Sequence, residues 1–258
     1  MFARIEARAL AALVIVLTAA LCGPQPARAQ TPVSLAALEP AAPPPSRSLA
    51  EPFGLNAMPV THGEILDKWN GIVADIRTER QTLRQCRDDA QTCSPAALKL
   101  LAVIDEGRAR GGRARAGVVN RAINLAIEPM SDLAQWGVAD RWSAPLVTLT
   151  TGRGDCEDYA IAKYVALSEA GIDEDRLRLV IVRDPASGED HAVLMVHVED
   201  KWLVLDNRRL AMLEDDGLRR FVPLFVLDYE GVRQFAPLGV ARAPAAGPDA
   251  PAPSSLGF

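Results

Sequence analysis

Residues 152–164 read Gly152-Arg153-Gly154-Asp155-Cys156-Glu157-Asp158-Tyr159-Ala160-Ile161-Ala162-Lys163-Tyr164. In this stretch a lone cysteine, Cys156, follows a glycine turn and precedes a segment that we expect to be an amphipathic helix. Unsatisfied backbone N–H groups and the positive end of the helix dipole favour a thiolate over a thiol at such a position. The sequence therefore predicts that Cys156 is a nucleophile at a helix N-terminus.

Two strand-like segments downstream carry a histidine and an acid. They read Asp190-His191-Ala192-Val193-Leu194 and Trp202-Leu203-Val204-Leu205-Asp206-Asn207. Cysteine, histidine and aspartate in this order suggest a nucleophile, its general base and the residue that orients the base. His197 shares a face with His191 by strand alternation, so it stays an alternative base, although a packing role suits it better.

The region before Cys156 predicts helices. From Glu64 to Cys86, apolar residues recur at spacings of three, four and seven, which is typical of a helix with one buried face. Ser94-Pro95 is an N-cap followed by proline at the first helical position, and it predicts a second helix. A third helix is expected over residues 113–126, ended by Glu128-Pro129.

The region after the cysteine helix changes to a strand pattern. Residues 177–182, 191–198, 202–205 and 221–227 are short β-rich runs separated by turn signals such as Asp184-Pro185. A helical half that carries the cysteine, packed on a small antiparallel sheet that carries the histidine and the aspartate, is an α+β fold.

The two ends of the chain differ from its middle. Arg4 and Arg8, an apolar run over residues 9–21 and Ala27-Arg28-Ala29 predict a signal peptide over residues 1–29, cleaved after Ala29. We therefore expect a soluble exported protein in the periplasm. A lipid anchor at Cys22 is the alternative, but Leu21 stands where a lipoprotein signal usually has a small residue. Composition predicts a disordered lead-in over residues 30–60, one domain over 61–238 and a disordered tail over 239–258.

Charge and cysteine content narrow the function further. The net charge of the 258 residues is −5 and no run of Lys or Arg stands out, so a nucleic-acid partner has no support. Three cysteines remain after signal removal, and Cys86 and Cys93 bracket a polar loop. In an oxidising compartment this pattern predicts a Cys86–Cys93 disulfide and a free Cys156. The alternative is three unpaired, buried cysteines.

Four segments together carry a family resemblance. They are Trp136-Gly137-Val138-Ala139-Asp140-Arg141-Trp142-Ser143-Ala144-Pro145, Gly154-Asp155-Cys156-Glu157-Asp158-Tyr159, His191-Ala192-Val193-Leu194 and Trp202-Leu203-Val204-Leu205-Asp206-Asn207. With them, residues 62–235 resemble the bacterial transglutaminase-like cysteine peptidases, whose best-known members are periplasmic proteases that release large surface adhesins in biofilm control. The resemblance implies a papain-like/transglutaminase-like core with Cys156 as the nucleophile, His191 as the base and Asp206 as the orienting residue.

Acidic residues around the thiol raise the question of a metal. Asp155, Glu157 and Asp158 place negative charge beside Cys156, and this raises a thiol pKa unless a cation is bound. The resemblance implies calcium, held by Asp155 and Glu157 with Asp140 as a third ligand, and no organic cofactor. The alternative is that the acids only cap the helix. Many relatives carry a glutamate where this chain has Val147, which bears on calcium affinity or cleavage specificity.

These inferences converge on an exported cysteine endopeptidase that works through a thioester and is expected to need calcium. The expected substrate is a surface adhesin or another periplasmic protein, and the resemblance implies, for some members, an inner-membrane receptor that responds to a cyclic dinucleotide. Two alternatives stay open. The thioester is transferred to an amine, as in a cross-linking transamidase, or the fold is a non-catalytic binding module.

Overall fold

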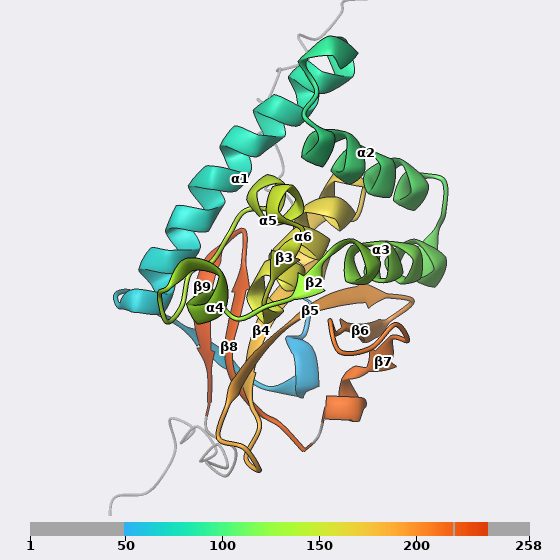
Figure 1. Cartoon of the computed structure of the whole chain (residues 1–258). Helices are drawn as coiled ribbons and strands as arrows, with labels where there is room; N and C mark the ends of the chain where they lie inside the picture. Colours follow the sequence, from blue (N-terminus) through green and yellow to red (C-terminus); the bar gives the residue numbers. More distant parts are fainter. Residues whose placement is uncertain (1–48, 219, 237–258) are drawn as a thin grey trace, which may run out of the picture. The chain divides into compact units, whose positions relative to one another are not determined.

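The computed structural model describes residues 49–218 and 220–236 (Figure 1). The predicted signal peptide, most of the predicted lead-in and the predicted tail lie outside the described residues. Within the described ranges, no helix has both the length and the apolarity needed to cross a membrane.

A seven-stranded sheet forms one side of the domain, with every neighbouring pair of strands antiparallel. The order of the strands across the sheet is β1-β9-β8-β4-β5-β6-β7, so the first and last strands in the described chain are neighbours. The strands are β1 (Ala57–Pro59), β4 (Leu177–Arg183), β5 (Asp190–Val198), β6 (Lys201–Leu205), β7 (Leu213–Glu214), β8 (Val222–Asp228) and β9 (Gly231–Phe235).

The helices lie on one side of this sheet (Figure 1). They are α1 (Glu64–Asp88), α2 (Pro95–Arg108), α3 (Gly112–Ala126), α4 (Asp132–Trp136), α5 (Pro145–Thr151) and α6 (Cys156–Glu169). Of these, α1, α3 and α6 contact the strands of the sheet directly. A separate parallel pair, β2 (Glu128–Pro129) and β3 (Arg153–Gly154), lies directly before the cysteine helix α6. Four short 3-10 helices complete the described domain: η1 (Pro52–Gly54), η2 (Ala90–Thr92), η3 (Glu174–Arg176) and η4 (Asp215–Leu218). The prediction of an α+β fold with helices packed on an antiparallel sheet is confirmed.

The cysteine helix α6 lies at the centre of the domain. Its residues from Glu157 to Leu167 are all buried, because α2, α3 and α5 pack on it from one side and β4 and β5 from the other. A helix that is buried on every side has no polar face. The prediction that this helix is amphipathic was therefore wrong, because tertiary packing encloses it completely.

The sheet separates two apolar cores. Along β5, Ala192, Leu194 and Val196 pack under the helices, whereas Val193 and Met195 pack on the opposite face. This alternation follows from the two-residue period of a strand. The second core is closed by Leu218 and Phe221 and by partly buried residues of the segment around η1, which are Phe53, Leu55 and Ala57.

The folded part of the chain begins before residue 61, where composition placed the start of the domain. We expected residues 30–60 to be disordered, but Ala57–Pro59 pair with β9 as strand β1, and Pro52 is buried. Glu51 forms ion pairs with Arg178 and Arg233. The expectation is wrong for this part of the lead-in, because apolar contacts and charge pairing with distant strands outweigh a proline-rich local composition.

The predicted disulfide is present. Cys86, near the end of α1, is bonded to Cys93, and the two Cα atoms are 4.8 Å apart across the short helix η2. Cys156 is the free cysteine of the described chain. The expected division into a structural pair and one available thiol is therefore confirmed.

Candidate active site

The turn before α6 fixes where Cys156 lies. A Cβ atom at Gly154 would lie 2.6 Å from Asp158 Oδ2, so only glycine fits against that side chain. Asp158 Oδ1 in turn accepts a hydrogen bond of 2.8 Å from the Ser143 backbone N–H. The Gly-Asp-Cys-Glu-Asp motif therefore joins the loop at Ser143 to the first turn of α6, and Cys156 is the first residue of that helix.

The histidine reaches this helix end because one edge of β5 is open. The pairing of β5 with β6 ends at Leu194 and Leu205, so His191 and Ala192 have β4 as a neighbour but not β6. The Ala192 backbone N–H is hydrogen-bonded to the Cys156 sulfur instead. Cys156 therefore occupies the side of β5 that β6 leaves free, next to His191.

The aspartate follows β6 directly. Asp206 Oδ1 lies 3.0 Å from His191 Nε2 and also accepts a hydrogen bond of 2.9 Å from the Arg208 backbone N–H. Burial alone would raise the pKa of Asp206, but these hydrogen bonds outweigh it and hold the pKa below its ordinary value. An ionised carboxylate only accepts hydrogen bonds, so Nε2 carries the proton. The other ring nitrogen of His191, Nδ1, is buried and has no hydrogen-bond partner within the described chain.

Cys156 and His191 line one cleft of about 370 Å³. Ile65, Trp142 and Phe225 contribute apolar wall to the same cleft. The Cys156 thiol donates a hydrogen bond of 3.2 Å to Glu157 Oε2. Burial and the Glu157 carboxylate raise the pKa of the thiol well above its usual range, while the Ala192 N–H acts in the opposite direction. Within the described chain, these effects together favour the neutral thiol over the thiolate.

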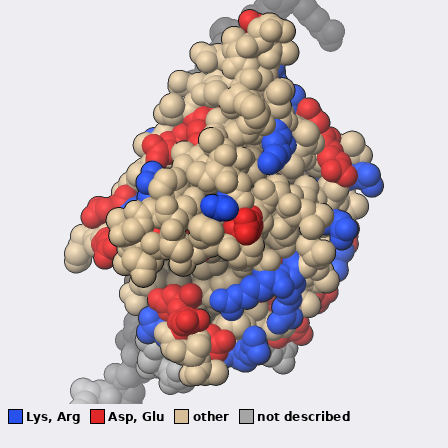
Figure 2. Space-filling view, viewed as in Figure 1, with Lys and Arg blue, Asp and Glu red and all other residues tan. Residues whose placement is uncertain are grey.

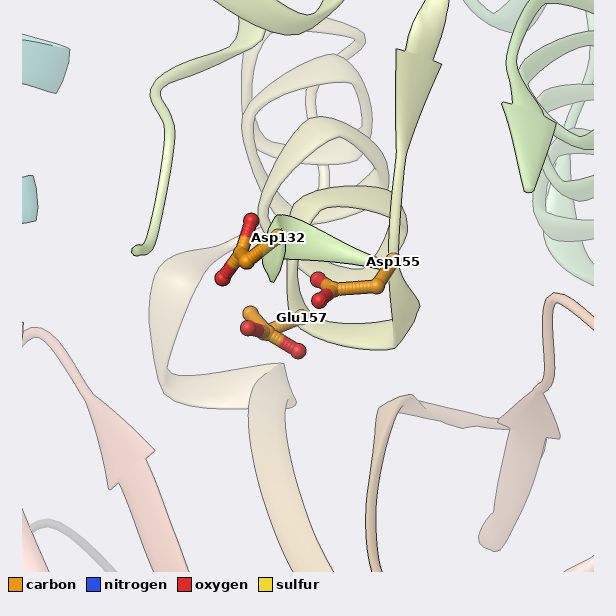
Figure 3. A group of neighbouring side chains, drawn as sticks. All are labelled: Asp132, Asp155 and Glu157. Atoms are coloured by element: carbon orange, nitrogen blue, oxygen red, sulfur yellow. The ribbon is translucent and has the colours of Figure 1, made fainter. Parts of the chain in front are cut away.

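Three carboxylates meet beside the thiol. Asp132, Asp155 and Glu157 each offer an oxygen, and these atoms lie within 4.8 Å of one another (Figure 3). Burial raises the pKa of all three, and the proximity of Asp155 raises that of Glu157 further. Oδ1 of Asp132 and Oδ1 of Asp155 are buried without a hydrogen-bond partner in the described chain. Unpaired, buried carboxylate oxygens that converge on one point suit a hard cation such as calcium.

The capping alternative is weakened by the geometry. Asp155 is the N-cap residue of α6, yet its side chain makes no capping hydrogen bond to the helix. It lies beside the carboxylates of Asp132 and Glu157 instead (Figure 3). The carboxylate of Asp155 is therefore directed towards the other acids and not towards the helix end.

Asp140, which we predicted as a metal ligand, does not belong to this acid cluster. Asp140 is paired with Lys68 at 49% side-chain exposure and is not a member of the converging group. The third acid of the cluster is Asp132, which is 1% exposed in the first turn of α4. Sequence analysis did not single out Asp132. It follows the N-cap residue Ser131, and an acid in the first turn of a helix is common without any metal.

The remaining residues that the sequence singled out lie in other settings. His197 packs edge-on against Trp202, with ring centroids 5.1 Å apart. Val147 is exposed on α5, and the backbone N–H groups of Leu146 and Val147 are bound by Glu79 of α1. The first turn of α5 is therefore bound by a carboxyl group, but this group belongs to Glu79 of α1 and not to α5 itself. On the face drawn in Figure 2, basic side chains gather in the lower right part and acidic side chains in the lower left part, with uncharged surface around them.

Comparisons with known proteins point to one family and one fold. The family model described as bacterial transglutaminase-like cysteine proteinase matches residues 80–216. A solved structure of Legionella pneumophila LapG is 24% identical, covers 59% of this chain and 87% of its own, and superposes with a TM-score of 0.51. Its calcium-bound form is 23% identical with the same coverages and TM-score. Its EGTA-treated form is 24% identical and covers 60% of this chain and 86% of its own, also with a TM-score of 0.51. A comparison with curated protein sequences finds no match.

Proposed function

Because the chain belongs to the bacterial transglutaminase-like cysteine proteinases and is therefore a cysteine peptidase, we propose that Cys156, His191 and Asp206 are its catalytic triad. One observation carries this assignment. The His191 ring is bound at Nε2 by Asp206, while Nδ1 is buried and, within the described chain, unpaired in the cleft that Cys156 lines. A ring held in this way has one nitrogen ready to accept a proton.

The chemistry follows from these positions. His191 Nδ1 takes the proton of the Cys156 thiol, and the sulfur attacks the carbonyl carbon of a peptide bond. The imidazolium then gives the proton to the leaving amine, and a thioester remains on Cys156. With His191 again as the base, water hydrolyses the thioester and restores the thiol. Asp206 stabilises the imidazolium and keeps the ring oriented. Backbone N–H groups at the start of α6, including that of Cys156, hold the oxyanion.

A calcium ion fits the acid cluster, and Asp132, Asp155 and Glu157 are the residues that would hold it. When bound, the ion supplies positive charge that offsets the carboxylates beside Cys156 and favours the thiolate. Glu157 accepts the hydrogen bond of the Cys156 thiol. If the Glu157 carboxylate held the ion instead, the thiol would be free to face His191. One of the similar solved structures is a calcium-bound form of LapG, which agrees with this assignment.

The site of action and the substrate rest on the sequence. The apolar stretch and the Ala27-Arg28-Ala29 signal support export to the periplasm, where a Cys86–Cys93 disulfide is stable. The sequence resemblance supports a surface adhesin as the substrate and an inner-membrane receptor as the regulatory partner. The described part of the catalytic domain consists of residues 49–218 and 220–236.

A peptide library is a direct test. The mature protein and Cys156→Ala are each incubated, with calcium and with a chelator, with a library of proteome-derived peptides, and new N-termini are read by mass spectrometry. We expect cleavages with wild-type protein and calcium, at least about a hundredfold fewer with Cys156→Ala or His191→Ala, and a large loss with chelator. Equal cleavage by Cys156→Ala would contradict the triad. Equal cleavage with calcium and with the chelator would contradict the calcium requirement and leave the triad in place.

A further inference from the structure

Lys163 is a buried basic side chain that the proposed chemistry does not use. It is fully buried on α6, seven residues after Cys156, and therefore lies on the same side of the helix about 10 Å further along. Its Nζ donates a hydrogen bond of 3.2 Å to the Leu205 carbonyl, and it lies 5.8 Å from the centre of the Tyr159 ring. Burying an amine costs free energy that methionine or leucine at the same position would not cost. A buried lysine at this position therefore needs an explanation, and its hydrogen bond to the Leu205 carbonyl suggests one.

The bonded carbonyl adjoins the predicted orienting acid. Leu205 is the last residue of β6 and pairs with Leu194, and the sheet ladder ends there. Asp206 is consequently the first residue that no strand pairing holds. Lys163 binds the peptide group that connects Leu205 to Asp206, at the point where the support of the sheet stops.

A second side chain binds the peptide group on the other side of Asp206. Asn124 Nδ2, from α3, donates hydrogen bonds of 2.9 Å to the Asp206 carbonyl and 2.8 Å to the Arg209 carbonyl. The carbonyls before and after the Asp206 side chain are thus held by two helices, α6 and α3. The carboxylate itself is left free to bind His191 and the Arg208 N–H.

We propose that Lys163 is a positioning residue which, together with Asn124, fixes the backbone on both sides of Asp206 and so directs its carboxylate towards His191. This inference rests on the proposed triad. Burial lowers the pKa of Lys163 to about 7, and the nearby Asp206 carboxylate opposes that effect. Both the amine and the ammonium form donate hydrogen bonds, so the contact with Leu205 persists on either side of neutrality.

The test compares Lys163→Met with Leu167→Met in the mature protein with calcium. Methionine retains the length and apolar stem of Lys163 but removes the donor. Leu167 is equally buried one turn further along α6 and has an apolar side chain, so its variant controls for repacking of the helix. Asn124→Leu removes the second donor at a partly exposed position and serves as an independent variant if Lys163→Met fails to fold.

Two readouts report on the orientation of Asp206. The first is the Nε2–H resonance of His191 in protein labelled with 15N-histidine, where the chain has three histidines. The second is the rate of Cys156 alkylation by iodoacetamide. We expect Lys163→Met and Asn124→Leu to broaden or shift the resonance towards that of Asp206→Ala and to slow alkylation about tenfold. Lys163→Gln, which keeps an N–H donor, recovers part of both, and Leu167→Met matches wild type.

The outcomes separate the inference from the triad on which it rests. A wild-type resonance and alkylation rate in folded Lys163→Met and in Asn124→Leu, with clear loss in Asp206→Ala, overturns the role of Lys163 and leaves the triad in place. An unchanged rate and resonance in Asp206→Ala itself overturns the triad, and the inference with it. Equal loss in Leu167→Met would assign the effect to packing of α6 and would also overturn the inference.

Discussion

At the residue scale, opposing influences act on Cys156. The start of α6 and the Ala192 N–H favour the thiolate, while burial and the acids on either side disfavour it. These acids are also part of the group in which oxygens of the described chain lack partners. The residues that disfavour the thiolate are thus the ones that a bound cation would neutralise, which is the reason for the calcium proposal.

Substitutions at the acid cluster distinguish the two possible third ligands. We predict that Asp132→Asn weakens calcium binding at least about tenfold, because it removes a buried charge from the converging group. Asp140→Asn is the matched control and leaves the affinity within about twofold, since that carboxylate is exposed and paired with Lys68. Calorimetric titration of each mature variant with calcium measures both constants. Weaker binding in Asp140→Asn than in Asp132→Asn would restore the ligand set predicted from the sequence.

Gly154 provides a second prediction at this scale. A Cβ atom would lie 2.6 Å from Oδ2 and 2.8 Å from Cβ of Asp158, so Gly154→Ala forces that side chain away from the Ser143 N–H. We expect a loss of about 2 kcal/mol in the free energy of unfolding and slower Cys156 alkylation. Urea denaturation and iodoacetamide kinetics measure the two effects. Gly152→Ala, at a left-handed position with no neighbour within 4 Å, costs stability by backbone strain but leaves the alkylation rate of the folded protein unchanged.

At the element scale, α5 shows how one helix depends on another. Its N-cap residue, Ala144, has no side chain that can cap, and the Glu79 carboxyl from α1 binds the Leu146 N–H at 2.9 Å. Burial raises the pKa of Glu79 to about 7, although these hydrogen bonds from α5 act in the opposite direction. The interface between α1 and α5 therefore contains a carboxyl group that holds its proton near neutrality.

This titration makes stability depend on pH in a definite direction. The folded state binds the Glu79 proton more tightly than the unfolded state, whose pKa is near 4.5. Between these two values the folded protein carries more protons, so this group's contribution to the free energy of unfolding falls as pH rises. We predict that Glu79→Gln matches wild type at about pH 5 and is more stable by about 1 kcal/mol at about pH 8.

Urea denaturation of the two proteins at several pH values tests this prediction. Because only the difference between variant and wild type is compared, other titrating groups cancel. A difference that is constant across this pH range would contradict the raised pKa. A variant that becomes less stable as pH rises would mean that the ionised carboxylate is the form that supports α5.

The elements also show why part of the fold was predictable. Helices α1, α2 and α3 and strands β4, β5, β6 and β8 carry apolar periods or caps within their own sequence, and the predicted ranges match closely. The short elements β7, β9, α4 and α5 contain too few residues to show a periodic pattern. The strand β1 is defined by β9, a partner far along the chain. Asp132 was missed for the same reason, since only the fold brings it to Asp155.

At the scale of the whole domain, the first described residues close its second core. Phe53 packs edge-on against Phe235 of β9, with ring centroids 6.0 Å apart, and the Trp202 indole N–H donates to the Ala50 carbonyl. Glu51 joins Arg178, Arg233 and the fully buried Asp228 in one ion-pair group. Within this group two carboxylates face two guanidinium groups, so each buried charge depends on the presence of the others.

The boundary of the domain can be tested by truncation. We predict that a protein beginning at Leu49 unfolds like the mature protein, whereas one beginning at Thr61, close to the boundary that composition suggested, is less stable by about 3 kcal/mol or more. The shorter protein loses β1, the apolar cover of the second core and the Glu51 carboxylate, so Arg178 and Arg233 each lose one of their acidic partners. Its denaturation slope in urea also falls, because less surface is buried in the folded state.

Glu51→Gln, tested in the full mature protein, separates the effect of the Glu51 charge from the effect of losing the segment. We expect it to reproduce only about 1 kcal/mol of the loss. Equal stability of the two truncated proteins would mean that the sheet and its ion pairs hold without this segment, and that the domain begins where composition placed it.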